Sequence, residues 1–455
     1  MNQKINLGNV RNVHFIGIGG VSMSGLAEIL KNDGFHVSGS DNNASATTRH
    51  LQAVGIDVKI PNAAENIRPD FDLVVYTAAV KPDNPEFIAA RSLGIPMMDR
   101  AMLLAEITKG FPQLVCIAGS HGKTTTTGLF STVAVEAGLD PTISIGGFTS
   151  TGSNYRVGQS DCFILEACEY SNSFLHWFPY IGLILNVDAD HIDFYGGMDG
   201  IIDSFARFAA NIHPDGALVI NTQTQGIERI KAAARCKVIT FGEGGLYYAA
   251  NTNFNESGNP SFDIYKEGTC LIRINLRLHG EFNIFNALAC FAAAEQLHLP
   301  HTVIKCGLEA ATGIKRRFEF KGMFNGAKII DDYAHHPTEV RACLAAARKS
   351  HKGRIICVFQ PHLYSRTRDL FDDFAASFGD ADSVHFVPIY AAREKYDPTI
   401  TVEMLSEHVR ANGGSVECHS DLYTAETCFR TILTPGDLLI TMGAGDVHFI
   451  GERLL

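Results

Sequence analysis

The sequence predicts an α/β protein with parallel sheets, arranged in three domains. Short β-branched runs alternate with helical patterns along almost the whole chain, which is typical of parallel β-α units. The chain has 455 residues, enough for about three domains of roughly 100–200 residues each. Because the alternation restarts near residues 108–112 and 312–317, we expect domains at 1–108, 109–313 and 314–455.

The first domain is predicted from four short strands and the helices between them. VHFIGIG, HVSGS, DLVVYTA and GIPMM are rich in β-branched residues and are bounded by Gly, Pro or Asp. SGLAEILKND, PEFIAARSL and RAMLLAEIT carry apolar residues at helical spacing. This order predicts a sheet covered by helices.

The second and third domains repeat the pattern. In the second, the strand LVCIAG leads into the helix GKTTTTGLFSTVAVEAG, which we expect to end at Gly138 as a C′ residue. LYYAANTNF, PSFDIYK and CLIRINLRL predict a β-rich insertion between about 247 and 280. In the third domain, AKIIDDYA, GRIICVFQ, SVHFVPIY and DLLITMGAG predict strands that alternate with helices.

Composition narrows the classes of function. The formal charge of −11 argues against non-specific binding of nucleic acid or of a membrane surface. No apolar run reaches the ~18 residues of a membrane span, and the first residues lack the pattern of a signal peptide. We therefore expect a soluble cytoplasmic protein, a monomer or a weak homodimer. The 11 cysteines include no CxxC pair, which favours buried reduced thiols over a metal or redox cluster.

The segment AGSHGKTTTT predicts a phosphate-binding turn. A strand ends in a turn bracketed by Gly119 and Gly122, and Lys123 and Thr124 follow at the start of a helix. Backbone N–H groups of such a turn surround an oxyanion, the lysine reaches the terminal phosphates, and the threonine can bind Mg²⁺. Only two residues separate the glycines, fewer than in the general P-loop pattern, and a Gly-Lys turn without a ligand is the alternative.

Polar side chains follow the next two predicted strands. CFILEA ends at Glu166, and Glu169 comes shortly after it. The strand in IGLILNVDADHIDFY is followed by Asn186, Asp188, Asp190 and His191. Ligands of open α/β sheets bind at the carboxyl ends of the strands, so these acids beside a P-loop predict a site for Mg²⁺ and a nucleotide. Each cluster taken alone fits a hydrated loop, and His191 is the least expected ligand because Mg²⁺ prefers oxygen.

The first domain begins with a glycine-rich turn in HFIGIGGVSMSG. Gly17, Gly19 and Gly20 follow a strand and precede a helix, where a diphosphate could bind, and Asp41 could accept a ribose hydroxyl. The third glycine of the dinucleotide pattern is Ser22 here. The residues alone leave three interpretations open: a nicotinamide dinucleotide, another nucleotide, or close packing without a ligand.

Arginines, histidines and one aspartate gather in the third domain, most of them just past the predicted strands. Arginine can bind phosphate or carboxylate with two parallel hydrogen bonds, although each residue taken alone fits a solvated surface charge. The group comprises Arg316, Arg317, Asp332, His335, His336, His362, Arg366 and Arg368.

Together these motifs resemble the Mur ligases, the ATP-dependent amide ligases of peptidoglycan synthesis. The resemblance spans all three predicted domains and implies a Rossmann-like N-terminal domain, a P-loop ATPase-like central domain and a Rossmann-like C-terminal domain. The segments that carry it are GSHGKTTTT, EACEYSNSF, NVDADHIDFY, HGEFNIFNALA, DDYAHHPTEV and FQPHLYSRTRDL.

The resemblance implies a role for each of several site residues. At the UDP-sugar it implies Gly17, Gly19, Gly20, Asp41 and His362. At ATP it implies Gly119, Ser120, His121, Gly122, Lys123, Thr124, Thr125, Asn283, Asn286, Arg317 and Asp332. Around Mg²⁺ it implies Thr124, Glu166 and His191, and around the amino-acid substrate Tyr333, His335 and Arg366. The residues we expect to act in catalysis are Lys123, His335 and Arg366.

Two segments indicate which member of the family is most similar. HFIGIGGVSMSGLAE and FQPHLYSRT point to the member that joins L-alanine to UDP-N-acetylmuramate with ATP and Mg²⁺. The recycling member, which attaches a whole tripeptide, is the nearest alternative. Two other classes remain open: a P-loop switch or motor ATPase, and a nicotinamide-dependent dehydrogenase, which would leave GSHGKTT unexplained.

Overall fold

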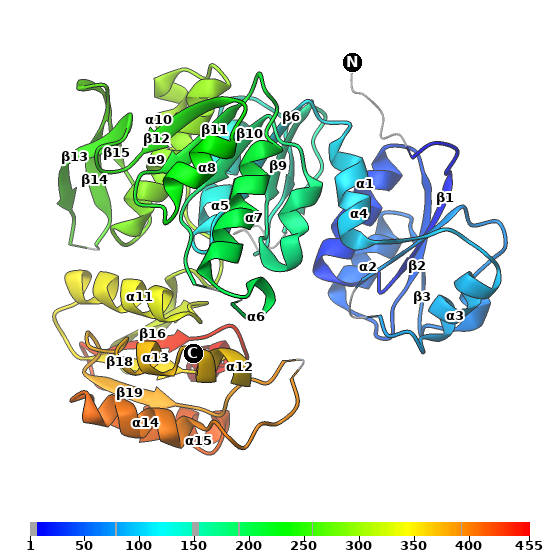
Figure 1. The fold of residues 1–455 in the computed structure, drawn as a ribbon. Coiled ribbons are helices and arrows are strands. Elements are labelled where there is room, and N and C mark those ends of the chain that lie inside the picture. The colour runs from blue at the N-terminus through cyan, green and yellow to red at the C-terminus, as the bar shows by residue number, and fades with distance from the viewer. Residues whose placement is uncertain (1–6, 78–79, 148–153, 190–191, 257, 393) are drawn as a thin grey trace. The chain divides into compact units, whose positions relative to one another are not determined.

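The computed structural model describes residues 7–77, 80–147, 154–189, 192–256, 258–392 and 394–455 (Figure 1). The chain divides into two compact units. Unit 1 comprises Met1–Tyr248 and Leu288–Leu308, and unit 2 comprises Ala249–Ala287 and Glu309–Leu455. Each unit is built around parallel sheets, as the alternating pattern predicts.

The first sheet of unit 1 contains five parallel strands in the order β3-β2-β1-β4-β5. The strands are Asn12–Ile16 (β1), His36–Ser40 (β2), Asp57–Lys59 (β3), Leu73–Tyr76 (β4) and Met97–Asp99 (β5). The helices are Val21–Asn32 (α1), Ala46–Ala53 (α2), Pro85–Ser92 (α3) and Arg100–Thr108 (α4). From β1 the chain continues to β2 and β3 on one side of β1, and it later returns as β4 on the other side of β1. The turn after β1 therefore lies at the switch point where ligands of such sheets bind.

The second sheet of unit 1 has the order β12-β11-β10-β6-β9-β7-β8, parallel except for β8. Its strands are Gln113–Ala118 (β6), Thr142–Ser144 (β7), Tyr155–Arg156 (β8), Cys162–Glu166 (β9), Ile181–Ile184 (β10), Ala217–Asn221 (β11) and Lys237–Phe241 (β12). The helices are Lys123–Glu136 (α5), Ile192–Tyr195 (α6), Met198–Ala210 (α7), Ile227–Ala233 (α8), Phe282–Gln296 (α9) and His301–Ala310 (α10). The boundary between the units falls within α9 and α10, so that the residues of α9 before Leu288 and those of α10 after Leu308 belong to unit 2. β6 lies between β9 and β10, so the polar residues that follow these three strands meet at one edge.

Unit 2 contains a six-stranded sheet in the order β16-β17-β21-β18-β19-β20 and the antiparallel pair β14-β15. The strands are Tyr247–Phe254 (β13), Pro260–Lys266 (β14), Thr269–Asn275 (β15), Glu319–Phe324 (β16), Ala327–Asp332 (β17), Ile355–Phe359 (β18), Ser383–Phe386 (β19), Val416–Cys418 (β20) and Leu438–Met442 (β21). The helices are Pro337–Ser350 (α11), Tyr364–Asp369 (α12), Phe371–Ala375 (α13), Val402–Ala411 (α14), Leu422–Ile432 (α15) and His448–Leu454 (α16).

The six-stranded sheet is buried on both faces. Along β18, Cys357 and Phe359 join one apolar cluster, which includes residues of α11, α13 and α14. The alternate residues Ile356 and Val358 join a second cluster, with residues of α15 and α16. Side chains alternate between the two faces of a strand, and this explains why β18 is apolar at every position.

The structure confirms the predicted strands and helices and adds seven strands, namely β3, β7, β8, β11, β12, β16 and β20. Of these, β3, β16 and β20 are edge strands in which most positions are exposed or half-buried, so they lack the apolar run that marks a buried strand. The predicted β-rich insertion forms β13, β14 and β15. Gly138 follows α5 with φ +72°, a conformation that glycine adopts at no steric cost.

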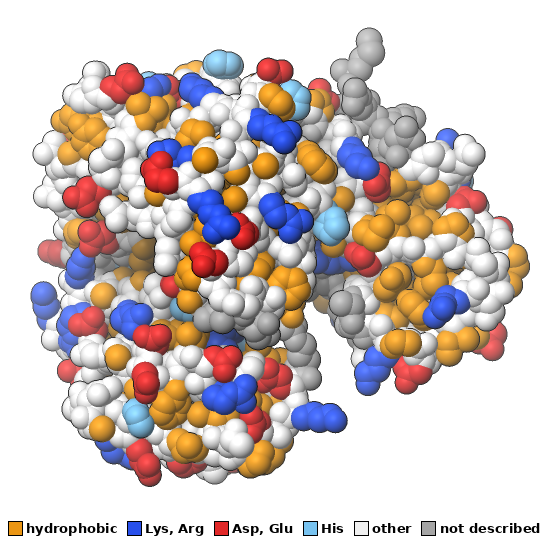
Figure 2. All heavy atoms as spheres, in the orientation of Figure 1, with side chains coloured by type: hydrophobic (Ala, Val, Ile, Leu, Met, Phe, Trp, Pro, Cys, Tyr) orange, Lys and Arg blue, Asp and Glu red, His pale blue; other side chains and the backbone are white. Residues whose placement is uncertain are grey.

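All 11 cysteines are free, although Cys168, Cys270 and Cys306 are exposed rather than buried as expected. Within the described residues, no helix combines the length and the apolar character needed to cross a bilayer. On the face shown in Figure 2, acidic and basic side chains are interspersed.

Candidate active site

The loop between β6 and α5 has the geometry of a phosphate-binding turn. Gly119 has φ +144°, and a Cβ there would lie 3.1 Å from that of Leu185, so only glycine fits without adjustment. Gly122 has φ +82° and directly precedes α5, whose N-terminus contributes partial positive charge. Ser120, His121, Thr124 and Thr125, all predicted to bind ATP, lie in this loop or in the first turn of α5.

The loop is held in place by the residues that follow β10. The backbone N–H of His121 donates to Oδ1 of Asn186 at 2.8 Å, and Nδ2 of Asn186 donates to the carbonyl of His121 at 3.0 Å. The backbone N–H of Asp188 donates to Oγ of Ser120 at 2.9 Å. Asn186 and Asp188 therefore fix the shape of the loop, a role that the sequence motif did not reveal.

Lys123 lies against a buried carboxylate. Its Nζ is 3.0 Å from Oε1 and 2.9 Å from Oε2 of Glu169, and it also donates to the carbonyl oxygens of Gly119 and Ser120. The side chains of Lys123 and Glu169 are 14% and 4% exposed. Burial is the largest single influence and by itself lowers the pKa of the Lys123 ammonium, but the charge and hydrogen bond of Glu169, together with the neighbouring Cys168 and Glu166, raise that pKa above its ordinary value. Lys123 is therefore a permanent cation in the phosphate-binding turn.

Two of the three residues predicted to bind Mg²⁺ are in contact. Oγ1 of Thr124 donates to Oε1 of Glu166 at 2.9 Å, and Oε2 of Glu166 accepts the backbone N–H of Gly146. A hydroxyl and a carboxylate are oxygen donors of the kind that Mg²⁺ prefers, so this pair fits the ion. The third predicted ligand, His191, lies outside the described residues, as does Asp190.

The glycine-rich turn after β1 is hydrogen-bonded to the residues at the end of β2. The backbone N–H groups of Gly17 and Ile18 both donate to the carbonyl of Ser40, and that of Gly20 donates to the carbonyl of Gly17. The N–H of Gly19 donates to Oδ2 of Asp41 at 3.0 Å. Asp41 thus holds the turn against the loop after β2.

In unit 2, the two asparagines predicted to contact the nucleotide are neighbours on α9. Nδ2 of Asn286 donates to Oδ1 of Asn283 at 2.9 Å, and Nδ2 of Asn283 donates to the carbonyl of His279 at 2.7 Å. Both asparagines are buried, at 5% and 6% exposure. Their hydrogen bonds fix the orientation of both amides.

Arg317, Asp332 and Tyr333 lie together at the end of β17. The Tyr333 ring lies beneath the guanidinium groups of Arg316 and Arg317, at 4.9 and 5.2 Å from its centroid. The Asp332 carboxylate accepts the backbone N–H groups of Phe318 and Ala334, each at 2.7 Å. Burial raises the pKa of Asp332 to about 6, against the opposing charge of Arg317.

The remaining predicted residues form a chain of ring contacts. His335 packs edge-on against Tyr333 and against His362, with centroids 5.4 and 6.0 Å apart. His362 stacks on Tyr390, and its Nδ1 is 3.4 Å from Nη1 of Arg366. The structure therefore brings together Tyr333, His335, His362 and Arg366, which are up to 33 positions apart in the sequence.

Two acidic residues that the sequence did not predict hold this part of the site in place. Glu339 lies 3.3 Å from Nδ1 of His335 and accepts its backbone N–H, and it is 3.9 Å from Arg317. Glu394 accepts the backbone N–H groups of Tyr364 and Ser365 at the start of α12. The four-residue spacing of His335 and Glu339 in DDYAHHPTEV is a signal that could have identified Glu339. No sequence pattern connects Glu394 to a helix that begins 30 residues earlier.

Unit 1 thus holds a cationic glycine-rich turn beside a hydroxyl and a carboxylate of the kind that could bind Mg²⁺, and unit 2 holds a group of arginines, histidines and amides. Phosphoryl transfer depends mainly on positioning and on neutralising charge, and these groups are suited to both.

Three family models match the chain. They describe the Mur ligase family catalytic domain at residues 12–112, the Mur ligase middle domain at 117–294, and the Mur ligase glutamate ligase domain at 316–445. Together they cover most of the chain, and they follow one another in the order expected from the sequence.

Individual proteins are similar over the full length. The chain is 47% identical to the UDP-N-acetylmuramate–L-alanine ligase of Clostridium novyi, with 98% of each chain covered. It is 46% identical to the ligase of the same name from Acetivibrio thermocellus, with 98% of this chain and 96% of the relative covered.

Solved structures share the fold. The UDP-N-acetylmuramate-alanine ligase of Thermotoga maritima superposes with a TM-score of 0.81 at 26% identity, covering 97% of this chain and 98% of the other. A murein peptide ligase of Psychrobacter arcticus has a TM-score of 0.71 at 23% identity, covering 98% of each chain. The chain therefore belongs to the Mur ligase family, with its three-domain α/β fold.

Proposed function

We propose that the protein joins L-alanine to the lactyl carboxylate of UDP-N-acetylmuramate, using ATP and Mg²⁺. The observation that carries this proposal is the 47% identity, over 98% of both chains, to a relative named for this reaction. The tripeptide-attaching alternative has weaker support, because two murein peptide ligases of known structure are 23% and 29% identical, over 98% and 68% of this chain. We take residues 1–108, 109–313 and 314–455 as the parts that bind the UDP-sugar, ATP and the amino acid.

The reaction begins with activation of a carboxylate, since a carboxylate does not react with an amine at neutral pH. The lactyl carboxylate attacks the γ-phosphate of ATP, which gives an acyl phosphate and ADP. Lys123 and the N–H groups of the turn after β6 neutralise the phosphate oxygens during this step. Thr124 and Glu166 would hold Mg²⁺, which would supply further positive charge at the phosphates.

In the second step the amine of L-alanine attacks the acyl carbon of the acyl phosphate, the C–N bond forms, and inorganic phosphate leaves. This step requires the alanine amine to lose a proton. Nδ1 of His335 lies 2.9 Å from the carbonyl of Tyr333 and 3.3 Å from Glu339, and both partners are acceptors. Nδ1 therefore carries the hydrogen of the neutral ring, which leaves Nε2 as the atom that accepts a proton. Glu339 would stabilise the resulting imidazolium, and Arg366 would bind the carboxylate of the amino acid.

The test is phosphate release by the purified protein with Mg-ATP and UDP-N-acetylmuramate. L-alanine is compared with L-Ala-γ-D-Glu-meso-diaminopimelate as the acceptor, and mass spectrometry identifies the product. We expect release with L-alanine and a product that is heavier by one alanyl residue. Release with the tripeptide alone would assign the protein to cell-wall recycling, and release with neither acceptor would refute the proposed ligation.

A further inference from the structure

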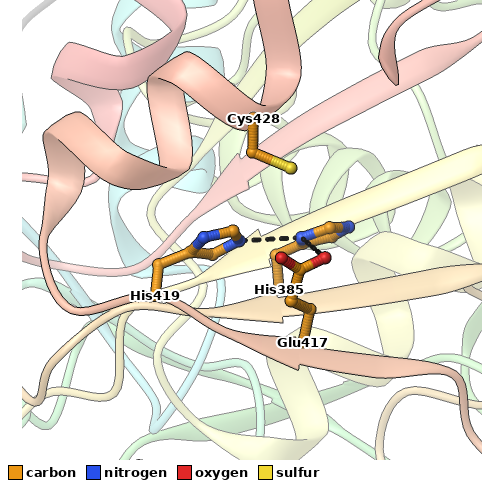
Figure 3. A group of neighbouring side chains, drawn as sticks. All are labelled: His385, Glu417, His419 and Cys428. Carbon is orange, nitrogen blue, oxygen red and sulfur yellow. Dashed lines mark hydrogen bonds and ion pairs between the residues drawn. The ribbon is translucent and has the colours of Figure 1, made fainter. Parts of the chain in front are cut away.

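Four side chains with metal-binding atoms converge in the C-terminal sheet, in a part of unit 2 that the reaction does not use. His385 belongs to β19, Glu417 to β20, and Cys428 to α15, while His419 directly follows β20. One ligand atom of each residue lies within 4.8 Å of those of the others. Figure 3 shows the four side chains pointing toward one another from these separate elements.

The two imidazoles direct nitrogen atoms toward each other. Nδ1 of His385 is 2.9 Å from Nε2 of His419, and the rings are almost parallel, with an angle of 11° and centroids 5.2 Å apart. The other nitrogen of His385, Nε2, is 2.9 Å from Oγ of Ser383. A hydrogen on Nε2 that is donated to this hydroxyl leaves the lone pair of Nδ1 directed into the cluster. This arrangement is common for histidines that bind metals.

Each nitrogen and sulfur ligand is electrically neutral before metal binding. Burial lowers the pKa of His385 to about 4, aided by neighbouring His419, and burial also lowers the pKa of His419. Both rings are therefore neutral at pH 7, which is the form that binds metal ions. Burial, followed by the charge of Glu417, raises the pKa of the Cys428 thiol. A metal ion that binds there must displace the thiol proton.

We propose that the protein binds one Zn²⁺ through Nδ1 of His385, Nε2 of His419, Sγ of Cys428 and a carboxylate oxygen of Glu417. Two imidazoles, a thiolate and a carboxylate are a donor set that suits Zn²⁺, which takes four ligands in a tetrahedron. Zn–N bonds of about 2.0 Å place two nitrogens about 3.3 Å apart in this geometry. The 2.9 Å between the histidine nitrogens must therefore open slightly, with a small tilt of the rings.

The ion would join two neighbouring strands and a helix. β20 is a three-residue strand at the edge of its sheet, paired with β19. A metal ion that links β19, β20 and α15 would hold this edge against the helix and would stabilise unit 2. The sequence did not suggest the site, because 32 residues separate His385 from Glu417 and no CxxC pair is present.

The experiment uses Co²⁺ as a spectroscopic substitute for Zn²⁺ in the full-length protein. After chelation and buffer exchange, the protein is titrated with Co²⁺ in excess Mg²⁺, which occupies sites made of oxygen ligands. We expect one equivalent to give the intense visible bands of tetrahedral cobalt and a near-ultraviolet thiolate charge-transfer band. One proton should be released per ion, and Zn²⁺ should displace Co²⁺ stoichiometrically.

Three variants identify the ligands. Cys428→Ser should abolish the thiolate band and weaken Co²⁺ binding at least about tenfold, whereas Glu417→Gln should keep the band and weaken binding to a smaller degree. Cys306→Ser, which changes an exposed cysteine on α10, is the matched control and should behave like the unmodified protein. The site is refuted if the unmodified protein gives no thiolate band, or if the band persists in Cys428→Ser. Because the unmodified protein alone can give the negative result, the test does not depend on the folding of any variant.

Discussion

Replacement of Lys123 should reduce both turnover and stability, and a second substitution should separate the two effects. Two opposite charges 2.9 Å apart attract by about 6 kcal/mol at an effective dielectric constant of about 20, and desolvation offsets part of this attraction. Lys123→Met leaves the Glu169 carboxylate, only 4% exposed, without its counter-charge. We therefore expect the free energy of unfolding to fall by about 3–5 kcal/mol.

The double variant Lys123→Met, Glu169→Gln removes both charges and should recover most of that stability. Its turnover should nevertheless remain at least about 10²–10³-fold below that of the unmodified protein, because no cation faces the phosphates. Binding of UDP-N-acetylmuramate, which we assign to the first domain, should change little in either variant.

Stability is measured by urea unfolding, followed by the fluorescence of Trp177, the single tryptophan of the chain. Trp177 is 4% exposed and lies in unit 1, so its emission reports on the unit that contains the ion pair. Turnover is measured by phosphate release. Equal destabilisation of the single and double variants would refute the coupling between Lys123 and Glu169, and unchanged turnover would refute the phosphate-binding role of Lys123.

Three further predictions concern other parts of the protein. Thr124→Val should raise the Mg²⁺ concentration for half-maximal activity about tenfold or more, and an unchanged Mg²⁺ titration would exclude Thr124 as a ligand. The pKa of Asp332 rises from 3.8 to about 6 on folding, so the folded state binds more protons between these pH values. The free energy of unfolding, measured by circular dichroism, should therefore fall by up to about 3 kcal/mol as the pH rises from about 4 to 6, and should stay level at higher pH. Asp332→Asn should remove this dependence on pH. Gly19→Ala places a Cβ 2.8 Å from Oδ2 of Asp41 and should weaken binding of the UDP-sugar by about 1–3 kcal/mol in calorimetry, whereas Gly379→Ala, with nothing within 4 Å, should bind it normally.

The sequence predicted those parts of the site in which one short segment contains both the pattern of a strand or helix and the polar residues of the site. The turn from Gly119 to Thr124 is one example, because a strand, two glycines and a helix start appear in uninterrupted order. Glu166 is another, because the end of a buried strand is visible as the end of an apolar run. The carboxyl ends of neighbouring parallel strands then bring such residues together without further information.

The interactions that the sequence did not predict join residues with no fixed spacing. Glu169 was seen as an acid after a strand, but its pairing with Lys123 depends on the three-dimensional course of the loop. Glu394 reaches the start of α12 from a different loop, and Asn186 uses its amide to hold the phosphate-binding turn. Such contacts arise from tertiary packing, and patterns of local propensity contain no record of them.

Substitutions on the two faces of β18 should have different consequences. The face toward α11 and α13 packs against α11, which begins directly after His336 and carries Glu339, so substitutions there should disturb the residues assigned to the reaction as well as the core. The face toward α15 and α16 carries none of the residues that we assign to the reaction. Substitutions in this second layer should therefore change the stability of unit 2 while the rate of ligation is preserved.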